Sequence, residues 1–201
     1  MPPVTVIQEA RPPVRERLLD AARRLIVSRG WARLRVSHVA AEAGVSRQSA
    51  YNEFGSKAAL GEALVMREFE RHLAGLSECL LDQRDDVEAA VAEAVLYTFR
   101  QTSSDPMLHG ILTSARVGWS AEELVDVLRR RKTPPLALAV RTVSELVARH
   151  RPDLDQAAVR LTVDMVCRVT ISYLVTPDGP PEESARRIAV MATRVLGAPV
   201  R

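Results

Sequence analysis

The sequence of 201 residues contains only two cysteines and four histidines, and their spacing suggests no chemistry. Cys79 and Cys167 lie far apart, so they predict neither a metal site nor a redox pair, and a buried structural thiol is the expectation for Cys167. The histidines are scattered singly, at His38, His72, His109 and His150. No group of serine, cysteine, histidine and aspartate resembles a catalytic arrangement. The sequence therefore predicts no enzyme active site, no metal site and no cofactor.

Aromatic residues make up 4% of the chain, and no apolar run reaches the ~18 residues that a membrane-spanning helix needs. Residues 1–17 lack an apolar core, so we expect no signal peptide. There is no Gly-rich phosphate-binding loop and no internal repeat. Ala, Leu, Val and Arg are frequent, which favours helices over sheets. We therefore expect an all-α protein of the cytoplasm with no membrane partner.

The formal net charge of +3 is unevenly distributed, because residues 1–57 carry +5 and the remaining residues carry −2. A basic segment at one end of a mildly acidic body fits a nucleic-acid-binding surface confined to that end. Chance surface charge is the alternative. The interpretation depends on whether the basic segment also contains a binding motif.

Residues 36–55 have the pattern of two short helices joined by a tight turn. The first helix is apolar and ends at Gly44, a residue type that tolerates the left-handed conformation at a helix C-terminus. Ser46 can cap the second helix, which stops near Gly55. Such a pair is a helix-turn-helix, whose second helix enters the major groove of DNA.

The second helix places four polar side chains on one contiguous arc, with Ala50 and Phe54 on the opposite side. Arg can pair with guanine, and Asn and Gln with adenine, while hydroxyls suit phosphates. A polar surface helix that touches nothing is the alternative. We predict that DNA is contacted by Arg35, Ser37, Arg47, Gln48, Ser49, Tyr51, Asn52 and Lys57. Of these, Arg47, Gln48 and Asn52 are expected to read base edges.

From Val14 to Leu64 the chain resembles the TetR family of bacterial transcriptional regulators, most clearly at Ala-Gly-Val-Ser (43–46), Tyr51, Phe54 and Lys57. The string from Arg47 to Lys57 is similar to that of a subset of actinobacterial members. The resemblance implies an all-helical homodimer with a DNA-binding headpiece and a larger domain that binds a small molecule and dimerises. Two positions depart from the pattern: Arg35 stands where the family usually has a Thr or Ser cap, and Glu53 where His is frequent.

The expected organisation is a flexible arm at 1–13, a helix-turn-helix headpiece at 14–57 and a helical ligand-binding and dimerisation domain at 58–201. Arg11 and Arg15 can reach a neighbouring groove, or the arm has no role. Outside the motif we expect helices at about 14–28, 57–83, 86–102, 105–115, 121–131, 135–150, 155–175 and 181–197. The helix at 57–83 links the headpiece to the body.

The helix at 155–175 is apolar on nearly all sides, and the helix at 181–197 has one apolar face. This pattern predicts contact with a partner chain in addition to the chain's own core. The resemblance implies a four-helix dimer interface in the same place, and the core of a monomer is the alternative. The residues expected at this interface are Val166, Val169, Tyr173, Ala185, Ile188, Ala192 and Val195.

The residues that bind the small molecule are the least determined by the sequence. For each candidate pocket residue, ordinary core is the alternative; the candidates are Phe69, Leu96, Phe99, Met107, Ile111, Trp119 and Met165, with Arg100 to orient a ligand. Their character favours an apolar or amphipathic effector. The leading hypothesis is a dimeric repressor that binds a palindromic operator and is released by such an effector. Activation, or an architectural or interaction protein without ligand control, are the alternatives.

Overall fold

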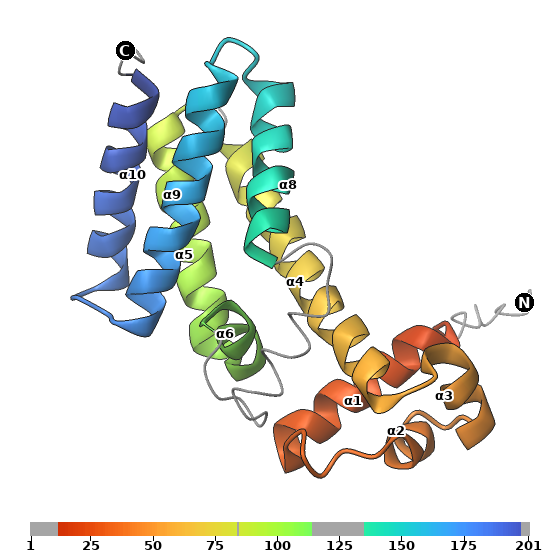
Figure 1. Ribbon diagram of the computed structural model, residues 1–201. Coiled ribbons are helices and arrows are strands. Elements are labelled where there is room, and N and C mark those ends of the chain that lie inside the picture. Colours follow the sequence, from red (N-terminus) through yellow and green to blue (C-terminus); the bar gives the residue numbers. More distant parts are fainter. Residues whose placement is uncertain (1–11, 84, 114–134, 198–201) are drawn as a thin grey trace, which may run out of the picture. The chain divides into compact units, whose positions relative to one another are not determined.

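The computed structural model describes residues 12–83, 85–113 and 135–197, and every regular element in these ranges is a helix (Figure 1). The chain divides into two compact units, one up to Leu64 and one from Val65 onward. The division lies within the long helix α4 (Lys57–Asp82) and not at its start, where the headpiece was expected to end. The helix expected at 121–131 lies outside the described residues.

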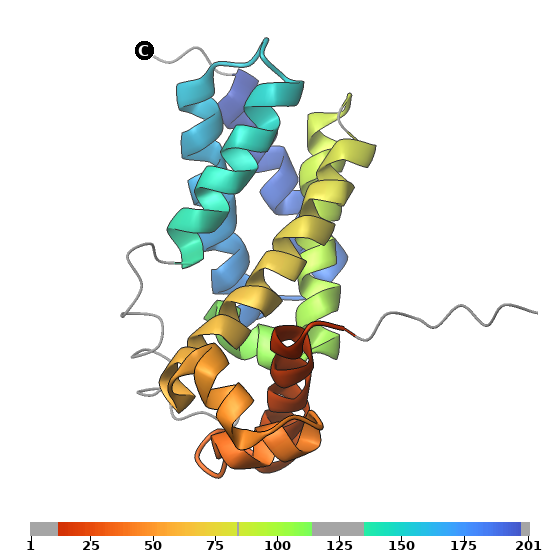
Figure 2. The ribbon, with the colours of Figure 1, turned by 90° about the vertical axis from the view of Figure 1, so that its right-hand side faces the viewer.

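The first unit consists of α1 (Val14–Arg29), α2 (Val36–Glu42), α3 (Arg47–Phe54) and the first turns of α4. Figure 2 shows these short helices gathered around the start of α4. α1 ends at Gly30, which has a φ of 78° and whose N–H donates to the carbonyl of Ile26. The core of the unit is made of aliphatic side chains from every helix and of Trp31, with Leu18, Ile26, Val39, Ala50, Leu60 and Leu64 among its members.

The second unit contains the rest of α4 with α5 (Val87–Ser104), α6 (Pro106–Thr113), α8 (Pro135–His150), α9 (Gln156–Val175) and α10 (Pro181–Gly197). Asp86 and Asp155 cap α5 and α9 by accepting from the N–H groups of Ala89 and Ala157. Three of the helices begin with proline, which fits the first helical turn. These local signals explain why most helix starts are close to those expected from the sequence.

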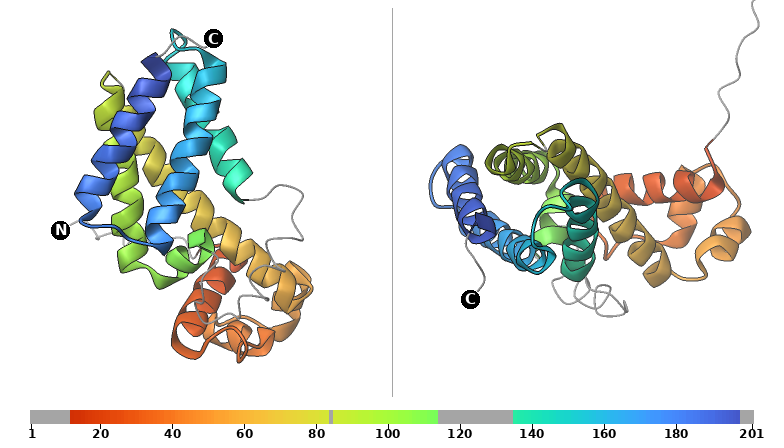
Figure 3. Two further views of the ribbon diagram at one scale, coloured as in Figure 1. Left: turned by 60° about the vertical axis from the view of Figure 1, so that its left-hand side comes forward. Right: turned by 90° about the horizontal axis from the view of Figure 1, so that it is seen from above.

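Within the second unit, α10 packs along α5 and also contacts α9, which in turn packs on α8 (Figure 3). A core cluster lies between these helices, formed by Val95 and Phe99 of α5 with Ala185 and Ile188 of α10. No helix in the described ranges is long and apolar enough to cross a membrane. The same residues contain no group of three His, Cys, Asp or Glu that could hold a metal ion.

Candidate functional site

The turn between α2 and α3 has the geometry that the sequence predicts. Gly44 adopts a φ of 61°, and the N–H of Val45 donates to the carbonyl of Ala40 at 3.0 Å, which closes the end of α2. The Ser46 hydroxyl accepts from the N–H of Ser49 at 3.0 Å and so caps α3. Ala50 is the buried residue of α3. The prediction of a helix-turn-helix is therefore confirmed as a structure.

The outer face of α3 carries four exposed side chains in two pairs. The Arg47 guanidinium lies over the Tyr51 ring, 5.5 Å from its centroid. The Gln48 amide donates to the side-chain oxygen of Asn52 at 2.8 Å. All four are exposed, and the pairs hold donors and acceptors in place along the helix. This arrangement suits base-edge recognition, while the individual DNA contacts remain predictions.

The remaining residues predicted to contact DNA are held in different ways. Arg35 is exposed and precedes α2 without capping it through its side chain, as its departure from the family pattern suggested. Ser37 and Ser49 are half-buried, and the Ser49 hydroxyl lies 2.8 Å from that of Ser46. Lys57 is also half-buried, with its Nζ 4.5 Å from the centroid of the Trp31 ring. Lys57 therefore ties α4 to the segment after α1, and its phosphate contact is still a prediction.

Several arginines of α1 stabilise the first unit, a role that sequence reasoning missed. The Arg17 guanidinium donates to the carbonyls of Ala43 and Gly44 and so satisfies the end of α2. Arg15 pairs with Glu53 at 3.0 Å, which assigns a structural partner to the residue that departs from the family pattern. The expectation that Arg15 reaches a DNA groove is not supported by this pairing, and Arg11 lies outside the described residues. Only the positive charge of α1 was visible in the sequence, since its partners lie far along the chain.

The second unit contains a cavity of 760 Å³ between α4, α5, α6, α8, α9 and the end of α10. Its walls are mainly leucine, valine and alanine. Of the residues predicted to bind a ligand, Phe69 and Ile111 line the cavity. Leu96, Phe99, Arg100, Met107 and Met165 do not line it. Trp119 lies outside the described residues.

The predicted ligand residues that do not line the cavity have other contacts. Phe99 is buried against α10 in the core cluster, and Leu96 packs against the same cluster. Arg100 is exposed and pairs with Glu93 at 2.9 Å, and it does not line the cavity. Met107 is buried in the core, and Met165 is only half-buried on α9. An apolar side chain alone does not reveal whether it faces a core or a cavity.

Sequence reasoning missed the polar groups of the cavity wall. His72 of α4 is buried, and burial lowers its pKa from 6.5 to about 4, so its imidazole is neutral near pH 7. Its ring stacks on Tyr97 with centroids 5.4 Å apart, and its Nε2 lies 3.4 Å from the Thr98 hydroxyl. The available signal was a histidine placed three residues after Phe69 on an otherwise apolar helix face.

Cys167 of α9 also lines the cavity, and burial raises the pKa of its thiol to about 11. A thiol with so high a pKa stays protonated and behaves as a small apolar group. The expectation of an unreactive structural thiol agrees with this environment, although the side chain is half-buried against a cavity and not enclosed in packed core.

The predicted dimer-interface residues are largely core of the single chain. Ala185, Ile188 and Ala192 have at most 2% of their surface exposed, because α10 packs this face on α5. Val166, Val169 and Tyr173 are half-buried against the same cluster. The buried residues are therefore core within one chain, and their place at a dimer interface stays a prediction. Val195 is half-buried, and its place at an interface stays a prediction.

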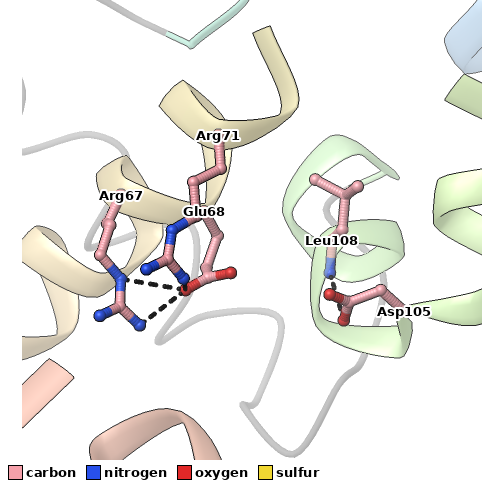
Figure 4. Close-up of polar contacts among 5 residues, drawn as sticks. All are labelled: Arg67, Glu68, Arg71, Asp105 and Leu108. Carbon is pink, nitrogen blue, oxygen red and sulfur yellow. Dashed lines mark hydrogen bonds and ion pairs between the residues drawn. The ribbon is translucent and has the colours of Figure 1, made fainter. Parts of the chain in front are cut away.

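The start of the second unit contains buried charge (Figure 4). Arg67 and Glu68 of α4 are each 8% exposed, and the Arg67 guanidinium donates to Glu68 Oε1 at 2.9 Å. Arg71 approaches the same oxygen at 3.4 Å. Asp105 caps α6 by accepting from the N–H of Leu108 at 3.3 Å. Buried ion pairs of this kind favour one arrangement of side chains more than they add stability.

A helix-turn-helix unit followed by a helical unit with an apolar cavity is typical of DNA-binding transcriptional regulators. Two family models match the chain. Residues 18–64 match "Bacterial regulatory proteins, tetR family", and residues 86–194 match "Bacterial Tetracyclin repressor, C-terminal domain". The chain belongs to the TetR family and is a DNA-binding transcriptional regulator.

Individual relatives agree with this family. The chain is 25% identical over 193 residues to the HTH-type transcriptional regulator AlkX of Mycobacterium tuberculosis, covering 92% of this chain and 86% of the relative. A crystal structure of the TetR family repressor AlkX from Dietzia sp., implicated in biodegradation of n-alkanes, superposes with a TM-score of 0.68 at 23% identity, over 92% and 97% of the chains. The multidrug binding protein EbrR, complexed with imidazole, gives a TM-score of 0.63 at 26% identity, over 94% and 98%.

Proposed function

We propose that the protein is a ligand-responsive transcriptional repressor that binds a palindromic operator as a homodimer and is released by a small apolar or amphipathic molecule. The observation that carries the proposal is the apolar cavity of 760 Å³ on the same chain as a capped helix-turn-helix. A cavity of this size lies within the range of small-molecule sites, which is about 300–1,000 Å³. An architectural protein has no use for such a cavity.

DNA recognition is assigned to α3 and its surroundings. Arg47, Gln48 and Asn52 read base edges, because they are exposed on one face and carry the donors and acceptors that the major groove requires. The residues assigned to phosphates or their vicinity are Arg35, Ser37, Ser49, Tyr51 and Lys57. Arginine residues of α1 that pair within the unit contribute to its stability more than to DNA contact.

The homodimer is assigned to the outward faces of α9 and α10. Leu161 and Val175 of α9 are 56% and 59% exposed, and they are the exposed large apolar side chains among the described residues of the second unit. Fourteen residues separate them, close to four helical turns, so they share one face. The pair Asp164 and Arg168, joined at 2.8 Å, lies on that face. A two-fold dimer through it places two headpieces on two half-sites, which predicts an inverted-repeat operator.

The helix α4 is the element through which ligand and DNA are coupled in this proposal. It begins at Lys57 in the first unit, and its later residues Phe69, His72 and Leu76 line the cavity. A ligand that favours a different placement of α4 changes the spacing of the two headpieces, which DNA requires near ~34–36 Å. The names of the relatives, a repressor implicated in n-alkane biodegradation and a multidrug binding protein, support an apolar effector.

The test is to measure operator affinity and ligand affinity on the same protein. The affinity of the protein for labelled DNA adjacent to the gene is measured by fluorescence anisotropy. The titration is repeated in the presence of each member of a panel of n-alkanes, 1-alkanols and long-chain alkanoates. Coupling should change each affinity by the same factor, typically about 5–150-fold. Arg47→Ala is the matched control, since it should weaken operator binding and keep ligand binding. A molecule that binds the cavity tightly and leaves operator affinity unchanged would promote the architectural alternative.

A further inference from the structure

The polar atoms of the cavity wall decide which end group a bound molecule can carry, because the rest of the wall is apolar. Two cavity-lining residues have a buried polar atom without a hydrogen-bond partner in the described chain, at His72 Nδ1 and Thr162 Oγ1. They come from α4 and α9. An unpaired polar atom in a low-dielectric interior is costly, so a ligand that supplies the partner gains affinity.

The hydrogen bonds around His72 determine what its free nitrogen can do. The Thr98 hydroxyl has one hydrogen, which it donates to the carbonyl of Ala94 at 3.0 Å. We therefore assign the proton of the neutral imidazole to Nε2, which then donates to the same hydroxyl oxygen at 3.4 Å. In a neutral imidazole the other nitrogen is then an acceptor. His72 Nδ1 thus requires a donor, such as a hydroxyl, and repels a carboxylate.

The basic groups of the described cavity lining already have partners within the chain. The Arg151 guanidinium donates to both carboxylate oxygens of Asp153, at 2.9 and 2.7 Å, and His150 Nδ1 lies 2.9 Å from the carbonyl oxygen of Leu146. His72 remains neutral near pH 7, because burial lowers its pKa to about 4. Moving a carboxylate into apolar surroundings without a cationic partner is strongly unfavourable.

The volume indicates the size of the molecule that the cavity can hold. The cavity of 760 Å³ corresponds to roughly 25 water-sized volumes of about 30 Å³ each. A methylene group is about as large as a water molecule, so a chain of roughly 12–18 carbons fits with some space unfilled. The walls offer such a chain leucine and valine side chains along its length.

We propose that the cavity binds an uncharged long-chain molecule with a terminal hydroxyl, as in a primary alcohol, and that His72 Nδ1 accepts the hydroxyl hydrogen. This inference rests on the proposed ligand-binding role of the cavity and specifies its chemistry. It distinguishes the ligand from a plain alkane, which leaves Nδ1 unpaired, and from an alkanoate, which brings an anion to an acceptor. Thr162 contributes space and a second hydroxyl but is not the anchor.

The test measures displacement of the neutral fluorescent probe N-phenyl-1-naphthylamine from the full-length protein near neutral pH. The competitors are 1-dodecanol, its isomer methyl undecyl ether, n-dodecane and dodecanoate. The alcohol and the ether have equal numbers of heavy atoms, but only the alcohol is a donor. The wild-type protein should bind the alcohol about 3- to 10-fold more tightly than the ether, the gain expected from one net hydrogen bond. Dodecanoate should bind more weakly than the alcohol.

The variants identify the anchor. His72→Phe should bind alcohol and ether equally and bind n-dodecane within about twofold of wild type, which also shows that the variant is folded. Thr162→Val should keep the preference for the alcohol. A wild-type protein without that preference, a tighter dodecanoate complex, or a preference lost in Thr162→Val and kept in His72→Phe would each overturn the inference.

The same samples separate this inference from the proposed function. Alcohol bound with the expected selectivity supports the His72 anchor whether or not operator affinity changes. Unchanged operator affinity would overturn the ligand response alone. If no competitor displaces the probe, and direct calorimetry detects no binding, both proposals fail.

Discussion

The buried imidazole of His72 should make the stability of the protein fall steeply under mild acid. An unfolded histidine titrates near pH 6.5, whereas burial lowers the pKa of His72 in the folded protein to about 4. Between these values the unfolded chain binds more protons than the folded one, so stability rises with pH. The contribution is therefore fully present above about pH 6.5 and is progressively lost down to about pH 4.

The structure sets the size of the effect. The full difference between a pKa of 6.5 and a pKa of about 4 corresponds to about 3 kcal/mol, and about 2 kcal/mol of it should already be lost at pH 5. The His72→Phe variant keeps a ring of similar size and lacks the titrating group. Its stability relative to wild type should therefore rise by about 2 kcal/mol between pH 7.5 and pH 5.

The assay is urea unfolding followed by helical circular dichroism at several pH values and one fixed protein concentration. Thr98→Val is the matched control, because it removes the hydroxyl that accepts from Nε2 and leaves the imidazole buried. Its pH profile should stay parallel to that of wild type. A His72→Phe profile that is also parallel to wild type would show that the imidazole is not held neutral by burial.

Three further predictions address the DNA surface, the dimer and the cavity wall. Arg47→Ala should weaken operator binding by about 1–3 kcal/mol and relax specificity at one base pair, measured by anisotropy on single-base operator variants. Equal operator affinity of Arg47→Ala and wild type would contradict the recognition role of Arg47. Leu161→Arg should yield a folded monomer with poor operator binding, because this side chain is 56% exposed and places charge only at the interface, and light scattering with circular dichroism checks both points. A Cβ added at Gly75 would lie 2.1 Å from the Tyr97 hydroxyl, so Gly75→Ala should displace that ring from His72 and lower the melting temperature relative to Gly197→Ala. Gly197→Ala, where a Cβ meets nothing within 4 Å, should not lower the melting temperature. Equal melting temperatures for the two variants would contradict the predicted steric clash at Gly75.

The helix-turn-helix could be predicted because its determinants are local. Gly44 and Ser46 specify the turn and the cap through their own backbone and side-chain chemistry, whatever the rest of the chain does. The helix starts of the second unit were predicted for the same reason, since Pro and Asp act within one turn.

The packing partner of α10 and the residues that line the cavity could not be predicted from the sequence, because both depend on which helices pack together. The apolar face of α10 at Ala185 and Ile188 indicates burial but not whether the partner is α5 or a second chain. The same ambiguity applies to Phe99, which packs in the core cluster and does not line the cavity. His72 was overlooked because a single polar residue on an apolar helix face carries no spacing signal, although its burial makes it the informative position.

The two cysteines give the chain a built-in kinetic reporter of how often its interior opens. Cys167 faces the cavity with a thiol whose pKa is raised to about 11, whereas Cys79 lies on α4 outside the cavity lining. Alkylation requires the thiolate and access of the reagent to it. The alkylation rate at Cys167 therefore measures the fraction of time that local opening of the second unit exposes this thiol. The rate at Cys79 in the same molecule corrects for reagent and pH. A molecule bound in the cavity should slow alkylation of Cys167 and leave alkylation of Cys79 unchanged. Mass spectrometry of the alkylated protein can therefore follow occupancy of the cavity in a mixture of unknown metabolites.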